Sequence, residues 1–143
     1  MTNKFSEENK NSLAQISKKK IRIETLKQKD FQNISDTETP QGIAVVFHKP
    51  KLQFSQTSFK GDKLIVMLDN ISDPGNLGTI IRDCDWFGIK NILLSESSVD
   101  YTNPKVIRSS MGSVFHVILY EDVDAISLIN FKKDGFKILC ADT

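Results

Sequence analysis

The second half of the chain alternates short apolar runs with segments of helical periodicity. Runs such as 64–68 are bounded by polar or glycine-containing stretches, as is typical of buried strands. Between the runs, apolar residues recur every three or four positions, which predicts amphipathic helices. The predicted strands are 64–68, 91–94, 114–119 and 136–140, and the predicted helices are 77–87, 103–112 and 122–133. Strands separated by helices predict an α/β fold with a parallel sheet and right-handed crossovers.

The predicted helices begin and end at residues that favour those positions. Asn103 precedes Pro104, which is the usual order of an N-cap and a first helical residue. Asn76 and Asp122 are the predicted N-caps of the other two helices. Gly135 is predicted to close the last helix, because glycine readily adopts the left-handed conformation found after helix ends.

The first half of the chain is patterned more weakly. Residues 1–12 are polar, and we expect them to be frayed or disordered. The predicted elements are a short strand at 21–23, a short helix within 26–34 and a strand at 43–47. A proline and many Gln, Ser and Thr residues after position 48 indicate a linker. The predicted domains are residues 1–50, a linker at 51–60 and a larger unit at 61–143.

Composition excludes several classes of protein. Hydrophobic residues make up 39% of the chain and charged residues 26%, as in soluble globular proteins. No apolar run approaches the ~20 residues needed to cross a bilayer, and the N-terminus lacks a signal-peptide core. Cys84 and Cys140 are far apart and have no metal-ligand spacing. We expect both to be buried thiols in a reducing compartment, and the protein to be cytoplasmic.

Charge is distributed unevenly along the chain. Residues 1–60 hold 11 Lys and Arg against 6 Asp and Glu, whereas residues 61–143 hold 8 against 12. A basic first half fits a chain that contacts a polyanion there. A solvated lysine-rich tail around 18–20 explains the same asymmetry without any ligand.

The segment 69–82 combines a strand end, a tight turn and a helix start. An apolar run ends at Asp69, a Pro-Gly turn follows, and the helical pattern begins at Leu77. Such a strand–turn–helix junction is where open α/β sheets place ligand chemistry. Arg82 lies on the polar side of the helix. An ordinary turn with Arg82 paired to a neighbouring aspartate is the alternative.

This segment resembles the first signature motif of the SpoU-type (SPOUT superfamily) RNA ribose 2′-O-methyltransferases. That motif reads approximately Asp-Pro-x-Asn-x-Gly-x-Ile-x-Arg, with Phe-Gly a few residues later. The matching residues are Asp73, Pro74, Asn76, Gly78, Ile80 or Ile81, Arg82, Phe87 and Gly88. A second block at 103–113 is similar to the family's second motif, and Thr39–Ala44 resembles the end of its recognition domain.

The resemblance implies the fold of the two domains. Residues 61–143 are expected to be the N-terminal part of a Rossmann-like SPOUT methyltransferase domain, which is knotted in the complete family fold. Residues 1–50 are expected to be part of a small α/β domain that recognises RNA. Nothing after position 143 supplies the knot-forming motif, so we expect a truncated form of the enzyme.

The resemblance also implies an activity, which is transfer of a methyl group from S-adenosylmethionine to a ribose 2′-hydroxyl of ribosomal or transfer RNA. Arg82 is expected to hold the phosphate and to stabilise the developing alkoxide, and Asn76 to touch ribose or phosphate beside it. The expected RNA-binding residues are Lys105, Arg108, Ser109 and Ser110, and the expected cofactor-binding residues are Ala141 and Thr143.

Each of these roles has a structural alternative. Asn76 serves as a helix cap without catalysis, and the segment 104–111 forms a short polar helix that packs Val106, Ile107 and Met111 inward. Lys105 is solvated in that alternative. RNA, and a second copy of the complete protein, are the expected partners; no metal and no membrane are expected.

Two other functions compete with methyl transfer. The chain could be a non-catalytic RNA-binding module of the same fold. An unrelated nucleotide-binding domain is disfavoured, because the chain contains no Gly-x-Gly-x-x-Gly and no Walker pattern.

Overall fold

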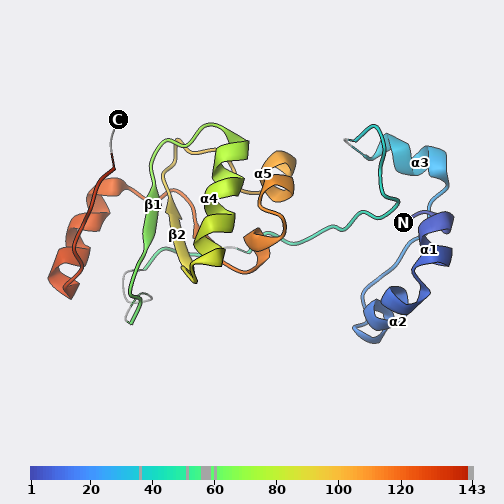
Figure 1. Ribbon diagram of the computed structural model, residues 1–143, viewed down its shortest axis with the longest axis horizontal. Coiled ribbons are helices and arrows are strands. Elements are labelled where there is room, and N and C mark those ends of the chain that lie inside the picture. The colour runs from blue at the N-terminus through green and yellow to red at the C-terminus, as the bar shows by residue number, and fades with distance from the viewer. Residues whose placement is uncertain (36, 51, 56–58, 60, 142–143) are drawn as a thin grey trace. The chain divides into compact units, whose positions relative to one another are not determined.

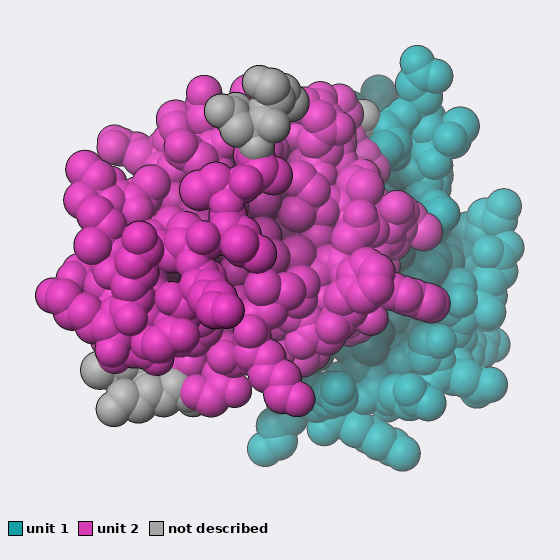
Figure 2. Space-filling model, turned by 60° about the vertical axis from the view of Figure 1, so that its left-hand side comes forward, with its two compact units in different colours: residues 1–48 teal, residues 49–143 magenta. Residues whose placement is uncertain are grey.

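The computed structural model describes residues 1–35, 37–50, 52–55, 59 and 61–141. The chain forms two compact units, Met1–His48 and Lys49–Thr143, which are coloured separately in Figure 2. Each unit is described here by itself.

The described residues of the first unit form three helices (Figure 1). They are α1 (Asn3–Glu8), α2 (Lys10–Lys18) and α3 (Gln28–Asn33). Thr2 joins the segments around them, because it forms a parallel bridge with Leu26 and donates its N–H to Gly42 O at 2.8 Å. Phe31 of α3 is buried.

Three predictions for the first unit are wrong. Residues 1–12 were expected to be frayed or disordered, but residues 3–8 and 10–18 are helical, and Thr2 Oγ1 caps α1 by accepting the N–H of Phe5. The strands expected at 21–23 and 43–47 do not form, and Val46 is 97% exposed. A strand needs a paired neighbour, and no partner strand lies beside either segment among the described residues. The helix expected within 26–34 is confirmed as α3.

The second unit contains a parallel sheet, as the alternating pattern predicts. Its strands are β1 (Val66–Leu68), β2 (Asn91–Leu94) and β3 (Ile118–Tyr120), in the order β1-β2-β3. The register pairs Met67 with Leu93 and Ile92 with Leu119. The helices between the strands are α4 (Pro74–Trp86) and α5 (Pro104–Ser109), and a short 3₁₀ helix η2 (Ser113–Phe115) precedes β3.

Successive residues of each strand face opposite sides of the sheet, and both sides are covered. On one side, Ile92 and Leu94 pack against Leu77 and Ile81 of α4. On the other side, Leu93 and Tyr120 pack with residues that include Phe131 of the 3₁₀ helix η3 (Ala125–Asp134). A sheet covered on both faces is the usual form for parallel strands.

The last part of the chain differs from the prediction. Asp124, rather than Asp122, caps the final helix, and that helix is 3₁₀. Gly135 closes it with φ of 88°, as predicted. The segment 136–140 joins no strand, so Cys140 is exposed rather than buried. Cys84 is buried in α4 as expected, and burial raises the pKa of its thiol.

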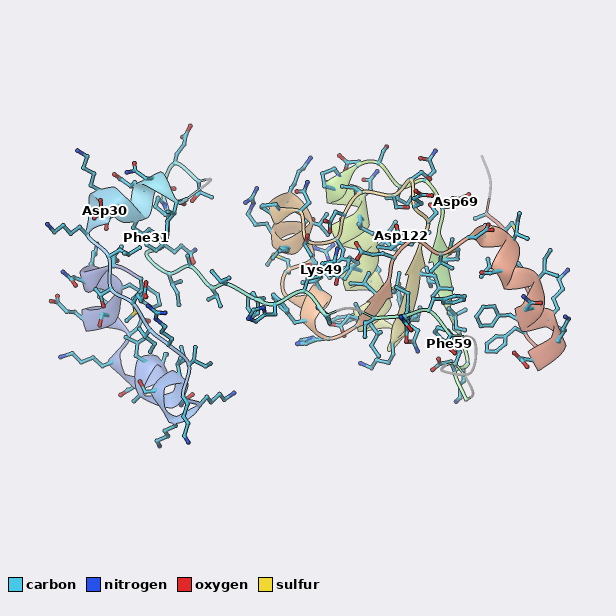
Figure 3. The ribbon with its side chains drawn as sticks, turned by 180° about the vertical axis from the view of Figure 1, so that it is seen from behind. Asp30, Phe31, Lys49, Phe59, Asp69 and Asp122 are labelled. Carbon is cyan, nitrogen blue, oxygen red and sulfur yellow. The ribbon has the colours of Figure 1, made fainter. Side chains whose placement is uncertain are left out.

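The segment predicted to be a linker contributes to the second unit. Phe59, labelled in Figure 3, is 1% exposed and packs edge-on against Tyr120 and Phe131. Phe54 packs against the same rings. Part of 51–60 therefore belongs to the core, because its aromatic residues cover a face of the sheet. Within the described residues, no helix is long and apolar enough to span a membrane.

We expect Phe59→Ala to lower the free energy of unfolding of the second unit by about 3–5 kcal/mol, because it removes a fully buried ring. Phe87→Ala is the matched control, since that ring is 77% exposed, and it should cost under about 0.5 kcal/mol. Denaturant unfolding measures both. Equal stability of the two variants would mean that Phe59 lies in a solvated linker.

Candidate functional site

The turn between β1 and α4 is held by the segment that follows β2. The N–H of Asn70 is donated to Ser95 Oγ at 2.9 Å, and the N–H of Ile71 to Ser98 Oγ at 3.3 Å. Val99 N–H bonds to Ile71 O at 2.8 Å. Asn70 has φ of 54°, a left-handed conformation that is unusual for a residue other than glycine. The turn therefore has a fixed shape at the carboxyl end of the sheet.

Asp73, not Asn76, caps α4. Its Oδ1 accepts the N–H of Asn76 at 2.7 Å, and Pro74 follows as the first helical residue. The helix thus starts three residues before the predicted start. The Asn76 hydrogen bond, with a smaller contribution from Lys105 at 3.4 Å, lowers the pKa of the Asp73 carboxyl. The helix N-terminus already holds a carboxylate, so it is not a free anion site.

α4 and α5 lie in close contact at Gly78 (Figure 1). A Cβ at this position would lie 1.9 Å from Ser109 Oγ and 2.8 Å from Val106 O. Ser109 Oγ in turn donates to Lys105 O at 2.8 Å, within α5, and also approaches Pro74 O of α4 at 3.2 Å. Only glycine lets the two helices approach this closely.

Arg82 lies on the side of α4 that faces α5. It follows Gly78 by four residues and Gly75 by seven, spacings that place all three on one side of a helix. The Arg82 side chain is exposed, and among residues that the structure describes it has no ion pair or hydrogen bond. The alternative, an ion pair of Arg82 with Asp83 or Asp85, is not formed among the described residues. The guanidinium is free to bind an anion.

Asn76 lies away from Arg82. A separation of six residues corresponds to about 9 Å along a helix and about 120° around it. The Asn76 side chain is exposed. The structure therefore does not bring the two expected catalytic residues together on one face of α4.

The expected RNA-binding residues divide into two groups. Lys105 and Arg108 are exposed on α5, next to the side of α4 that carries Arg82. Ser110 is fully buried and its hydroxyl donates to Ile107 O, so this conformation does not present it to RNA. Ser109 is half-buried against α4, where its hydroxyl is used within the protein. We call the three exposed cations Arg82, Lys105 and Arg108 the basic surface of the α4–α5 pair. Lys105 lies near the start of α4, where it pairs with Asp73.

Two hollows lie elsewhere in the second unit. One, of about 680 Å³, is lined by residues that include Lys63, Ile65 and Phe136, and a smaller one of about 120 Å³ adjoins it. Neither is lined by any residue of α4. Ala141 is exposed and lines neither hollow, and Thr143 lies outside the described residues. Neither of these two hollows would hold S-adenosylmethionine against Arg82.

Sequence reasoning missed two further contacts of the second unit. His116 Nδ1 lies 2.9 Å from Asp85 Oδ2, and this contact lowers the pKa of the Asp85 carboxyl. Lys49 pairs with Glu121 at 2.6 Å and with Asp100 at 3.4 Å. Neither pair has a sequence signature, because both join residues that are distant along the chain. No group of three or more His, Cys, Asp or Glu among the described residues is placed to hold a metal ion.

Comparison with known families agrees with this architecture. Residues 63–143 match the SpoU rRNA Methylase family, and residues 2–53 match the substrate-binding domain of RNA 2′-O ribose methyltransferases. The first match covers more than half of the chain. The chain belongs to the SpoU rRNA methylase family, which confirms the resemblance and the α/β fold class predicted from the sequence.

Several individual proteins are similar to this chain. The mitochondrial rRNA methyltransferase 3 of Xenopus laevis is 38% identical over 130 residues, which are 86% of this chain and 31% of that protein. The 23S rRNA (guanosine(2553)-2′-O)-methyltransferase RlmP of Bacillus subtilis is 36% identical over 118 residues, 82% of this chain and 46% of that protein. The chain thus spans less than half the length of either relative.

A solved structure supports the fold. An RNA methyltransferase assigned to the TrmH family, from Porphyromonas gingivalis, superposes with a TM-score of 0.58 and 32% identity. The match covers 78% of this chain and 45% of that one.

We expect Gly78→Ala to destabilise the second unit by about 1–3 kcal/mol, because its Cβ would collide with Ser109 and with the backbone at Val106. Thr79→Ala, at an exposed position of the same helix, should cost under about 0.5 kcal/mol. Adding Ser109→Ala to Gly78→Ala should recover part of the loss. Thermal and denaturant unfolding measure these effects, and a Gly78→Ala protein as stable as Thr79→Ala would refute the close contact.

We expect Asp73→Ala to lower the melting temperature at neutral pH by a few degrees, because it removes the cap of α4. The pKa of Asp73 is lowered in the folded state, so its stabilisation is present above its ordinary value of 3.8 and is lost as the pH falls through the lowered value. The difference from wild type should therefore shrink in acid. Asp83→Ala removes an exposed carboxylate from the same helix without removing a cap, and its effect should be smaller at neutral pH.

Proposed function

We propose that this protein takes part in transfer of a methyl group from S-adenosylmethionine to a ribose 2′-hydroxyl of RNA. Ribosomal RNA is the favoured substrate, because both relatives described above are named as methyltransferases of ribosomal RNA. The observation that carries the proposal is the unpaired, exposed guanidinium of Arg82 on the capped helix α4, in a chain of the SpoU family.

Arg82 acts in this proposal as a fixed cation. Arginine stays protonated in proteins, so it donates hydrogen bonds and does not accept a proton. Its guanidinium can hold a phosphate oxygen pair through two N–H groups, next to the ribose that reacts. The same charge favours the negative charge that develops on the 2′-oxygen as the hydroxyl proton passes to solvent. Lys105 and Arg108 extend the basic surface along the RNA backbone.

S-adenosylmethionine supplies an already activated methyl group when it is bound. Neither of the two hollows described above is lined by Arg82, so no step of the mechanism is assigned to contacts with this cofactor. The expected roles of Ala141 and Thr143 stay predictions.

Two further expectations also stay predictions. Association of two copies is supported by exposed apolar surface at the end of α4, where Trp86 is 85% and Phe87 77% exposed. The cytoplasmic location rests on composition alone.

The second candidate function is RNA binding without catalysis. One observation favours it, which is that the two hollows described above are not lined by any residue of α4. Calorimetry with S-adenosylmethionine on this chain separates the two functions, because micromolar binding would count against a non-catalytic module.

We expect Arg82→Ala to lower methyl transfer by about 10²–10³-fold without changing the melting temperature, because the side chain makes no described contact. Arg82→Lys should retain part of the activity, since it keeps the charge but loses the two-bond geometry. Transfer is measured with radiolabelled S-adenosylmethionine and ribosomal RNA. Alkaline hydrolysis then locates the label, because a 2′-O-methyl group protects the adjacent phosphodiester bond.

Lys132→Ala is the matched control, since it removes an exposed cation from η3, on the other side of the sheet. It should leave transfer unchanged. Arg82→Ala with wild-type activity would remove Arg82 from the mechanism. If alkaline hydrolysis released the radioactive label in mononucleotides, the methyl group would not be on the ribose.

A further inference from the structure

Three serines follow β2, and two of them contact the turn that leads into α4. Ser95 Oγ accepts the Asn70 N–H and Ser98 Oγ the Ile71 N–H, as described above. The two hydroxyl oxygens lie 3.1 Å apart, and Ser98 also donates to Leu68 O at 3.4 Å. The third serine, Ser97, is exposed, and among the described residues its hydroxyl reaches only Ser95, at 3.2 Å.

The hydrogen atoms of this network can all be placed. A serine hydroxyl donates one hydrogen bond and accepts up to two. The Ser98 hydroxyl donates to Leu68 O, and the Ser95 hydroxyl donates to Ser98 Oγ. Each oxygen then accepts one backbone N–H of the turn. In this arrangement the N–H groups of Asn70 and Ile71 are both bonded, and the hydroxyls of Ser95 and Ser98 both have an acceptor.

The network holds the start of α4 from the side of the sheet, in addition to the contacts with α5. Those contacts are the close approach at Gly78 and the hydrogen bond from Ser109 Oγ to Pro74 O. The turn ends at Asp73, which caps the first turn of α4. Fixing the backbone at Asn70 and Ile71 thus fixes where α4 begins, and hence where Arg82 lies along the axis.

We propose that Ser95 and Ser98 are positioning residues for Arg82. They hold the turn at 69–73 so that the guanidinium lies where the RNA phosphate and the 2′-oxygen require it. This inference rests on the proposed methyl transfer. Misplacement of a reacting group by about 1 Å can cost about 10²-fold in rate, so loss of either hydroxyl should be visible in catalysis.

The test measures methyl transfer by Ser95→Ala, Ser98→Ala and the control Ser97→Ala, in the same protein that shows wild-type activity. We expect kcat to fall about tenfold or more in the first two variants, with KM for RNA changed less than about twofold. Ser97→Ala should match wild type. Ser95→Thr and Ser98→Thr should retain most of the wild-type kcat, because threonine keeps the hydroxyl group.

A second readout follows the turn directly. Hydrogen exchange at the amides of Asn70 and Ile71 should accelerate in the alanine variants and not in Ser97→Ala. The positioning role would be overturned if kcat fell only in proportion to a fall in melting temperature and the threonine variants were no more active than the alanine variants. Wild-type kcat in Ser95→Ala and Ser98→Ala would also overturn it. An inactive wild-type protein would instead contradict the proposed function, and the two failures are therefore distinguishable.

Discussion

The close approach of α4 and α5 at Gly78 is the contact on which the candidate site depends. It joins the helix that carries Arg82 to the helix that carries Lys105 and Arg108, although 23 positions along the chain separate Arg82 from Lys105. A larger side chain at Gly78 would push the helices apart by its collision with Ser109. The basic surface therefore exists because a small residue lies at a helix crossing.

The segment between β2 and α5 supports the site from another direction. Its first residues hold the turn at 69–73 through Ser95 and Ser98. Its later residues are held by Lys49, which pairs with Asp100 and lies 4.9 Å from the centre of the Tyr101 ring. Burial alone would raise the pKa of Asp100, but the hydrogen bonds from Thr102 and the charge of Lys49 lower it. Lys49 thus anchors the start of the second unit to the same segment that shapes the turn.

For some elements the sequence pattern was sufficient to predict the secondary structure correctly. The apolar runs at 64–68 and 91–94 contain β1 and β2, because a strand buried on both faces is continuously apolar. The pair Asn103-Pro104 gave the start of α5 correctly. The strands expected at 21–23 and 43–47 failed, because an apolar alternation forms a strand only when a neighbouring strand pairs with it. Asn76 failed as a cap because Asp73, three residues earlier, accepts the N–H that a cap must satisfy.

The sequence by itself determined the α/β class, the parallel sheet, the family and the choice of Arg82, because these depend on periodicity and on a local motif of fixed spacing. Only the tertiary structure decided which of the candidate residues meet. Ser110 is buried, Asn76 lies around the helix from Arg82, and Phe59 belongs to the core. Burial and contact across α4, α5 and the sheet depend on packing between distant segments, and no local pattern encodes that packing.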